Sequence, residues 1–230
     1  MSAILRAEGV TKSFISGEKR LDVLTGVDLS VERGEVLAIV GPSGVGKSTL
    51  LHIMGTIDTP TGGTVLIDST DAFALSDGER AAFRNRTVGF VFQFHHLLRE
   101  LTALENVMMP CLIAGMPRAD AARRAGSLLE RVRLSERADH RPGELSGGEE
   151  QRVAVARALA TGPLVVLADE PSGNLDRASG EELHDLVWEL RESTGQTFVI
   201  VTHNQDLFER ADRVVGLEAG RASELPRGCA

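Results

Sequence analysis

The chain has 230 residues and a formal net charge of −8 at pH 7, and its 42% hydrophobic and 25% charged residues are ordinary for a soluble globular protein. This length is enough to bury a core in one domain, with or without an inserted lobe. The negative charge disfavours a nucleic-acid-binding role, because that role needs a basic surface against the phosphates.

Cysteine usage and hydropathy bear on the compartment and the membrane. Two cysteines, Cys111 and Cys229, lie too far apart in the sequence to suggest a disulfide framework, which favours a reducing cytoplasm. Residues 1–10 show no signal-peptide pattern. The most apolar window, 107–116, is too short to span a bilayer and contains a proline. We therefore expect no direct membrane insertion, so that any work at a membrane needs a partner subunit.

The first predicted elements are strands. Residues 21–31 alternate apolar and polar side chains in short pieces, which predicts antiparallel strands. Continuous apolar runs rich in Val and Ile then recur, and such runs are typical of parallel strands buried on both faces. These runs are 36–40, 88–92, 164–168 and 197–201. Helical patterns separate them, at 48–55 and 181–193 for example, so the order predicts an α/β fold with a mostly parallel central sheet.

The middle of the chain lacks such runs. Residues 117–134 carry apolar side chains at helical spacing on a charged background. A further helix is predicted from Glu149 and ends at a Gly-Pro stop signal. We therefore expect a mostly helical lobe at 94–162, inserted into an α/β core made of residues 1–93 and 163–230.

The run at 36–40 leads into a loop suited to phosphates. The stretch GPSGVGKST has the spacing G-x-x-x-x-G-K-[ST], follows a predicted strand and opens a predicted helix. Its glycines let backbone N–H groups wrap around phosphates, and the helix N-terminus adds partial positive charge. We expect Lys47 to bind the β- and γ-phosphates and the Ser48 hydroxyl to bind Mg²⁺. The predicted nucleotide-binding residues of this loop are Gly41, Pro42, Ser43, Gly44, Val45, Gly46, Lys47, Ser48 and Thr49.

Polar groups suited to phosphate chemistry follow the other three runs within a few residues. They are Gln93, Asp169, Glu170 and His203. In open α/β sheets, sites form at the carboxyl ends of the strands. We expect Asp169 to hold Mg²⁺, Gln93 to sense the metal or the attacking water, and Glu170 to orient or deprotonate that water. His203 is expected to hydrogen-bond the γ-phosphate. The alternatives are a helix-capping acid for Asp169 and a structural hydrogen-bonding role for His203.

Three further residues raise the question of a ligand. Phe14 is the only aromatic residue before the phosphate loop, and the chain has no tyrosine, so its ring is a candidate to stack on a nucleotide base. A place in the core is an equally good interpretation. His95 and His96 suggest a metal, but neighbouring residues of a helix point in different directions and no cysteine or carboxylate completes a set. We interpret both histidines as surface or lobe contacts.

The stretch ELSGGEEQR (144–152) contains a second loop suited to an anion. Ser146 is a predicted N-cap, and Glu149, three residues on, completes a capping box. Gly147 and Gly148 leave backbone N–H groups bare at a helix start, which suits an anion. The spacing does not say which anion this is.

These stretches, in this order, resemble the motifs of ATP-binding subunits of ATP-binding-cassette (ABC) transporters over nearly the whole chain. GPSGVGKST resembles the Walker A loop, FQF carries the Q-loop glutamine, LSGGE is similar to the signature motif, and VVLADE resembles Walker B. TH at 202–203 resembles the switch histidine. SGNLD resembles the D-loop, with the residues Ser172, Gly173, Asn174, Leu175 and Asp176. The resemblance implies a P-loop NTPase (RecA-like) core with a mostly parallel sheet, an N-terminal antiparallel β subdomain and an inserted α-helical lobe.

The resemblance also implies an ATPase that uses ATP and Mg²⁺ at a homodimer interface. Two chains would meet head to tail in the ATP-bound state, so that the signature loop of one acts on the ATP held by the other. The signature residues are Ser146, Gly147, Gly148 and Glu149. The departures from the family pattern are Phe14 for tyrosine, Glu150 for glutamine or arginine, Ser172 for threonine and Asn204 for aspartate. None of them removes a catalytic group.

Shorter stretches point to a subfamily. QFHHLL, LTALENVMMP and HRPGELSGGE resemble the ATPases of lipoprotein-releasing systems, whose relatives include macrolide-exporter and cell-division ATPases. This resemblance implies integral membrane permease subunits as partners, and a peripheral position at the cytoplasmic face of the bacterial inner membrane. It also implies release of lipoproteins from that membrane. We expect 107–116 and 93–98 to contribute to the groove that receives the permease.

Three alternatives remain open from the sequence. The first is the ATPase of a macrolide-type exporter, and the second is a cell-division ATPase that regulates a membrane partner without transport. The third, a soluble ABC ATPase of DNA repair or translation, is disfavoured, because the chain is acidic and lacks a large insertion or a second cassette.

Overall fold

The structure of the chain, a computed structural model, describes residues 3–17 and 19–226, so that Cys229 lies outside the described residues. Contacts within the chain divide it into two compact units. Unit 1 consists of Met1–Arg84 and Gly195–Ala230, and unit 2 consists of Asn85–Thr194. The boundaries predicted from the sequence, 94–162 for the lobe, separate helices from a sheet, whereas the two units are defined by contacts. The predicted boundaries therefore stay a prediction.

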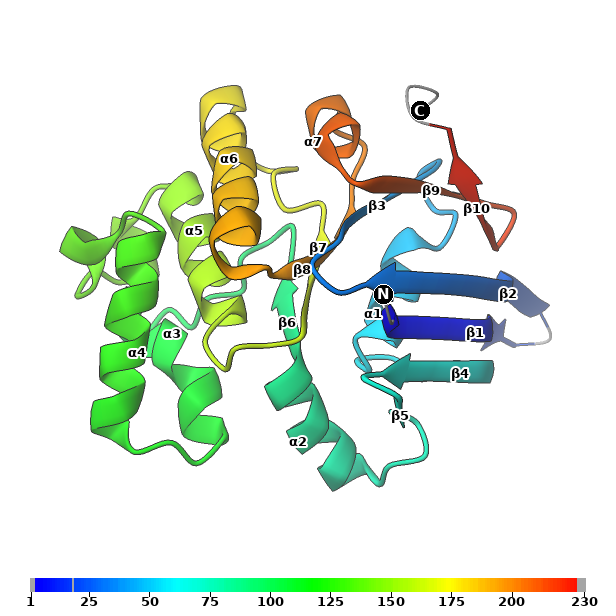
Figure 1. Cartoon of the computed structure of the whole chain (residues 1–230), viewed down its shortest axis with the longest axis horizontal. Coiled ribbons are helices and arrows are strands. Elements are labelled where there is room, and N and C mark those ends of the chain that lie inside the picture. Colours follow the sequence, from blue (N-terminus) through cyan, green and yellow to red (C-terminus); the bar gives the residue numbers. More distant parts are fainter. Residues whose placement is uncertain (1–2, 18, 227–230) are drawn as a thin grey trace. The chain divides into compact units, whose positions relative to one another are not determined.

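Unit 1 contains an antiparallel sheet, as residues 21–31 predicted. Its strands run alongside one another in the order β2-β1-β4-β5 (Figure 1). Buried side chains alternate with more exposed ones along the second half of β2, where Val27, Leu29 and Val31 are buried. The strands are β1 (Ala3–Ser16), β2 (Lys19–Glu32), β4 (Gly62–Ile67) and β5 (Thr70–Asp71).

Unit 1 also contains parallel strands. β3 pairs in parallel with β8 on one side and with β9 on the other, and β10 adds an antiparallel edge to β9. Every residue of β3 and β8 is buried, as their continuous apolar runs predicted. The strands are β3 (Val36–Val40), β8 (Thr197–Val201), β9 (Arg213–Glu218) and β10 (Arg221–Leu225). Two helices follow strands of this group, α1 (Lys47–Met54) and α7 (Gln205–Arg210). A third helix, α2 (Asp77–Thr87), contains the last residues of the first segment of unit 1 and continues into unit 2.

Unit 2 combines a parallel strand pair with helices. β6 and β7 pair in parallel, and α3, α4 and α5 pack against one another. No strand occurs among residues 94–162, as the sequence predicted. The elements of this unit are β6 (Val88–Val91), α3 (Ala103–Ile113), α4 (Arg118–Arg131), the 3₁₀ turns Ser135–Arg137 and Pro142–Glu144, α5 (Gly147–Ala158), β7 (Val165–Asp169) and α6 (Arg177–Thr194). The helix predicted from Glu149 begins earlier, at Gly147, because Ser146 is its N-cap.

The apolar window 107–116 is largely part of the core of unit 2. It lies in α3, where Val107, Met108 and Cys111 are buried. Burial raises the pKa of the Cys111 thiol, which leaves it protonated and unreactive at neutral pH. These three buried residues do not line the surface of unit 2, whereas Ile113 is 69% exposed. That the window contributes to the groove that receives the permease stays a prediction. Among the described residues, no helix has both the length and the apolar character needed to cross a bilayer.

Gly89 provides a test of the packing of α5 against β6. A Cβ atom at Gly89 would lie 2.3 Å from the carbonyl oxygen of Ala158, which belongs to the backbone and cannot rotate away. We expect Gly89→Ala to lower the free energy of unfolding by about 1–3 kcal/mol, which is typical of overpacking. The measurement is urea unfolding followed by circular dichroism.

Gly126 in α4 is the matched control for Gly89. No atom lies within 4 Å of a Cβ built there, so Gly126→Ala should raise the free energy of unfolding by about 0.5–1 kcal/mol. Equal stability of the two alanine variants would contradict the close approach of α5 to β6.

Candidate active site

The phosphate loop connects β3 to α1 and depends on two glycines. Gly41 has φ +148° and Gly46 has φ +107°. A Cβ atom would lie 2.4 Å from the Leu217 carbonyl oxygen at Gly41 and 2.7 Å from the Val23 side chain at Gly46. A side chain at either place would push the loop away from its neighbours, so the bare backbone is a steric requirement.

Charge at the start of α1 favours an anion. Lys47 donates hydrogen bonds to the Gly41 and Pro42 carbonyls, at 2.8 and 3.0 Å, which hold its ammonium group at the loop. The first turn of α1 contains no acidic residue, so nothing on the helix opposes the positive end of its dipole. Ser48 is exposed in this turn. The arrangement suits the phosphates of a nucleotide.

His203 and the phosphate loop follow neighbouring strands of unit 1. His203 is exposed and comes directly after the buried pair Val201 and Thr202 at the end of β8, and β8 pairs in parallel with β3. The carboxyl ends of β3 and β8 therefore lie at the same edge of the sheet, as the sequence predicted. Asn204 then caps α7, because its side chain accepts a hydrogen bond from the Leu207 N–H.

Phe14 is not a core residue. It lies on β1, the residue is 44% exposed, and the Lys12 ammonium group lies 5.0 Å from the ring centroid. The exposed ring excludes the interpretation that Phe14 fills the core and leaves the base-stacking interpretation as a prediction.

Gln93 and the D-loop come together in unit 2. Gln93 lies just after β6, while Asp169 is the last residue of β7, and these two strands are neighbours. The Gln93 side chain donates to Asn174 Oδ1 at 3.1 Å, and Asn174 Nδ2 donates to the Gln93 carbonyl oxygen at 3.1 Å. This reciprocal pair connects two of the predicted loops.

Glu170 has an unusual backbone. Its φ of +46° lies in the left-handed region, which non-glycine residues rarely adopt. The Gly173 N–H donates to the Glu170 carbonyl oxygen at 2.9 Å and supports the turn. Such conformations cost about 1–3 kcal/mol and cluster at functional sites. The outlier therefore supports a special role for Glu170.

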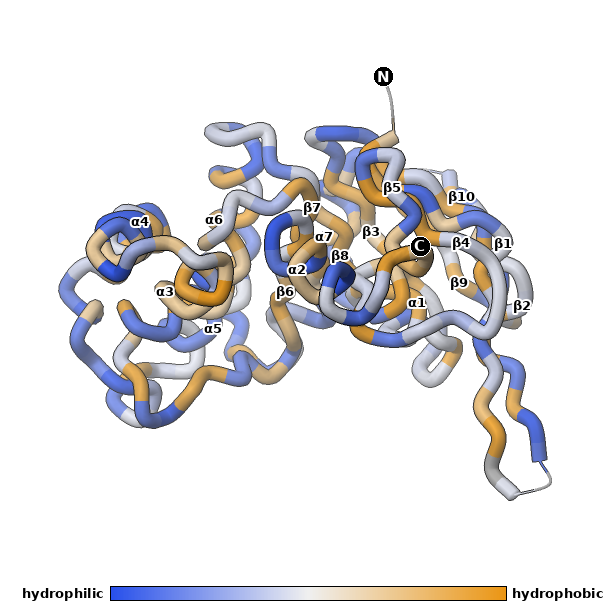
Figure 2. The backbone as a smooth tube through the Cα atoms, turned by 90° about the horizontal axis from the view of Figure 1, so that it is seen from below, coloured by the Kyte–Doolittle hydropathy of each residue, from blue (hydrophilic) through white to orange (hydrophobic). Residues whose placement is uncertain are grey.

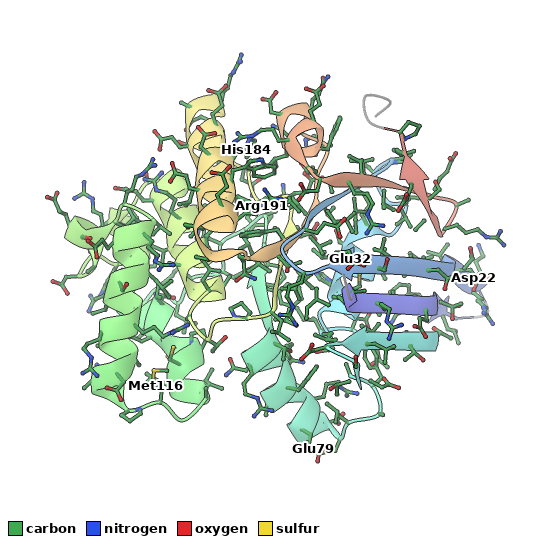
Figure 3. All side chains as sticks on the ribbon, viewed as in Figure 1. Asp22, Glu32, Glu79, Met116, His184 and Arg191 are labelled. Carbon is green, nitrogen blue, oxygen red and sulfur yellow. The ribbon has the colours of Figure 1, made fainter. Side chains whose placement is uncertain are left out.

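The D-loop leads into α6 through two side-chain contacts. Ser172 Oγ lies 2.9 Å from Nε2 of the buried His184, which Figure 3 labels on α6. Asp176 accepts hydrogen bonds from the Ser179 N–H and hydroxyl at 3.0 and 2.8 Å, and these bonds lower the pKa of the Asp176 carboxyl. Gly173 and Asn174 between them are exposed.

The signature loop forms the capping box that its spacing predicted. Ser146 Oγ accepts from the Glu149 N–H at 3.3 Å, and the Glu149 carboxylate accepts from the Ser146 N–H at 2.8 Å. The bond from the Ser146 N–H, assisted by Arg137, lowers the pKa of Glu149 against the opposing effect of burial. Ser146 and Gly147 are exposed, and the first N–H groups of a helix have no partner within it. The start of α5 is thus a rigid and accessible set of donors.

Sequence reasoning missed the side chains that hold the segment after β6. Gln151 donates to the Phe92 carbonyl at 2.8 Å, and Arg157 donates to the His95 and His96 carbonyls, each at 2.7 Å. Asn106 exchanges hydrogen bonds with the backbone of Leu98. The signal in the sequence was an amide residue among the apolar residues of a predicted helix. Asn106 and Gln151 are such residues, and both are buried, so each needs hydrogen-bond partners.

His95 is a lobe contact, as the sequence analysis interpreted it. Its Nε2 lies 2.9 Å from the Glu150 carboxylate on α5. Among the described residues, no group of three or more histidine, cysteine or acidic side chains has a geometry that could hold a metal ion.

These features define a nucleotide-binding cassette: a phosphate loop, polar groups at the ends of strands, and a glycine loop with a capped helix start. A family model described as ABC transporter matches residues 24–173. The chain belongs to the ABC transporter family, as the resemblance of its motifs predicted.

More specific relatives are ATP-binding proteins of lipoprotein-releasing systems. The chain is 56% identical to the lipoprotein-releasing system ATP-binding protein LolD of Geobacter metallireducens, over 96% of this chain and 98% of the relative. It is 55% identical to the protein of the same name from Bacteroides fragilis, over 94% and 99%.

A solved structure shares the fold. It is titled as the dimeric structure of MJ0796, a bacterial ABC transporter cassette, and it matches with a TM-score of 0.88 and 40% identity over 96% of this chain and 99% of that one. Another structure of that cassette, described as a dimeric post-hydrolysis state bound to ADP and Pi, matches with a TM-score of 0.88 and 39% identity over the same shares.

Proposed function

We propose that this chain is the ATP-hydrolysing subunit of an ABC complex that releases lipoproteins from the bacterial inner membrane. The observation that carries the proposal is the identity of 56% with a lipoprotein-releasing ATP-binding protein over nearly the full length of both chains. The chain would be peripheral at the cytoplasmic face of that membrane and act through integral permease subunits.

The phosphate loop and Phe14 would bind ATP. Backbone N–H groups of 41–49 would wrap the phosphates, Lys47 would neutralise the β- and γ-phosphates, and Phe14 would stack on the adenine. The Ser48 hydroxyl, the Gln93 amide oxygen and the Asp169 carboxylate are oxygen ligands of the kind Mg²⁺ prefers. When bound, Mg²⁺ supplies positive charge that offsets the charge of the phosphates during transfer.

Hydrolysis needs an activated water and stabilised charge. Glu170 would accept the proton of the water as its oxygen forms a bond to the γ-phosphorus and the bond to the ADP oxygen breaks. His203 and Lys47 would donate to the oxygens of the transferred phosphoryl group. The products are ADP and inorganic phosphate.

The two anion loops differ in charge, and this difference supports a site shared between two chains. The first turn of α1 has no acidic residue, whereas the first turn of α5 carries Glu149 and Glu150. The signature loop alone is therefore a weaker anion site, since carboxylates repel a phosphate. We propose that it closes on a γ-phosphate already neutralised by Lys47 and Mg²⁺ of the other chain, and that ATP thus holds a homodimer together.

The segment after Gln93 is the proposed contact with the permease. Phe94 is 63% exposed and Leu98 is 47% exposed, while Asn106 and Arg157 hold the backbone of this segment. Exposed apolar side chains on a fixed backbone are typical of an interaction surface. The segment begins at a residue expected to sense the nucleotide, so hydrolysis can be transmitted to the partner.

The homodimer gives the first test. Glu170→Gln keeps the shape of the side chain but removes the base, so ATP stays bound and intact. We expect this variant to elute as a dimer with Mg-ATP and as a monomer with ADP, because each chain carries a net charge of −8 and only the bridging nucleotide offsets that repulsion. The measurement is size-exclusion chromatography with light scattering.

A second substitution checks which loop closes the site. Ser146→Arg, added to Glu170→Gln, places a bulky side chain where the γ-phosphate of the other chain is expected. This double variant should stay monomeric with Mg-ATP. If it dimerises as well as its parent, the signature loop does not take part in the shared site.

The permease contact gives a separate test. Leu98→Asp should abolish lipoprotein release by the reconstituted complex and leave the basal hydrolysis of the isolated subunit unchanged, because Leu98 is about half exposed and its backbone makes the local hydrogen bonds. Ala74→Asp is the control and should release lipoproteins normally, since Ala74 is an exposed apolar residue of unit 1. Normal release by Leu98→Asp would place the permease contact elsewhere.

A further inference from the structure

Lys12 is a mostly buried lysine next to the ring of Phe14. Its side chain is only 12% exposed, and a lysine is seldom buried to this extent unless its charge is paired. The ammonium group donates to Asp58 Oδ1 at 2.6 Å and to the Thr59 carbonyl at 2.7 Å, and it lies 5.0 Å from the centroid of the Phe14 ring. Three groups thus hold one cation in a single place.

The partners of Lys12 belong to the turn that ends α1. The N–H groups of Ile57 and Asp58 donate to the His52 carbonyl in the last turns of this helix, at 2.8 and 3.2 Å. Asp58 Oδ1 also accepts from the Thr59 N–H at 2.7 Å, which orients the carboxylate. The other end of α1 is the phosphate loop, so one helix connects Lys47 to the anchor of Lys12.

The neighbours of Phe14 along β1 are held to the same turn. The Thr61 N–H donates to the Thr11 carbonyl at 2.8 Å, and the Ser13 N–H donates to Thr61 Oγ1 at 3.0 Å. The Ser13 hydroxyl donates to Asp22 across the hairpin at 2.6 Å, and Figure 3 labels Asp22 near the start of β2. This bond, with a smaller contribution from Arg20, lowers the pKa of Asp22.

Beyond Phe14 the hairpin has little support. Ile15 is 81% exposed and Leu21 is 64% exposed. Figure 2 shows the two strands extending away from the rest of unit 1, with hydrophobic residues close to the described end of the hairpin. Phe14 therefore lies where the anchored part of β1 ends, and a ring at such a place needs a local contact to stay in one orientation.

We propose that Lys12 is a positioning residue for nucleotide binding, which fixes the Phe14 ring at a set distance from the phosphate loop. The cation lies over one part of the ring, and Phe14 remains 44% exposed, which leaves room for a base to stack. Helix α1, with eight residues at about 1.5 Å each, acts as the spacer between the phosphate end and the base end. This inference rests on the proposed function, since it takes a nucleoside triphosphate as the ligand.

The experiment compares a ligand that has a base with one that has none. Isothermal titration calorimetry on the full chain measures Kd for ATP and for inorganic triphosphate. Lys12→Met keeps the apolar stem and removes the ammonium group. We expect the affinity for ATP to fall by about fivefold, as loss of a cation–π contact and its anchoring would produce, while the affinity for triphosphate stays unchanged. Lys12→Arg should retain most of the ATP affinity.

A double-mutant cycle tests whether Lys12 acts through the ring. Phe14→Ala should weaken ATP binding and leave triphosphate binding unchanged, and adding Lys12→Met to it should cause no further loss. Lys19→Met is the matched control, because Lys19 is an exposed lysine of the same hairpin and its loss changes the net charge equally. It should leave both affinities unchanged.

Two controls separate a loss of nucleotide binding from a loss of folding. Asp58→Asn removes the carboxylate charge but keeps an acceptor, so it should reduce ATP affinity less than Lys12→Met does. Thermal unfolding should show that every variant is folded at the temperature of the titration. The inference is overturned if Lys12→Met weakens ATP and triphosphate equally, or weakens ATP further in the Phe14→Ala background. If the unaltered chain binds neither ligand, the proposed function itself fails.

Discussion

The close approach of backbone to backbone at the phosphate loop is the constraint on which the rest of the site depends. The expected donors to the phosphate oxygens are backbone N–H groups of this loop. The loop can keep its path only because Gly41 has no side chain to meet Leu217 and Gly46 has none to meet Val23. The same contacts join the loop to β9 and to β2. A side chain at Gly46 would therefore disturb β2, which pairs with the strand that carries Phe14, and a side chain at Gly41 would disturb β9.

The two anion loops differ in the charge of the helix that follows, which explains why one chain carries both. Helix α1 presents an ammonium group and no first-turn acid, so its loop suits a highly charged ligand by itself. Helix α5 presents a capped start with two glutamates, one bound to Ser146 and Arg137 and the other to His95. Its N–H donors are rigid but poorly suited to hold a free anion. In a head-to-tail homodimer the first loop would bind the phosphates and the second would complete the enclosure.

Much of the fold could be predicted because its signals are local. The limits of β3 and β8 agree with continuous apolar runs. The capping box of α5 follows from the spacing of Ser146 and Glu149, although the helix begins at Gly147, two residues before its predicted start. The burial of Val107, Met108 and Cys111 could not be predicted, because an apolar helical run looks the same whether neighbours cover it or not, and α4 and α5 pack against α3 here. The contact of Lys12 with Asp58 joins residues 46 positions apart, and no sequence pattern indicates such a pair.

The central claim is that each ATP is hydrolysed between the phosphate loop of one chain and the signature loop of another. The most direct measurement is the ATPase rate of a mixture of Lys47→Ala chains and Ser146→Arg chains, compared with the rate of each variant alone. A mixed dimer combines the intact phosphate loop of the second chain with the intact signature loop of the first. The account predicts that the mixture hydrolyses ATP although neither variant does so alone. A mixture no more active than its components would contradict it.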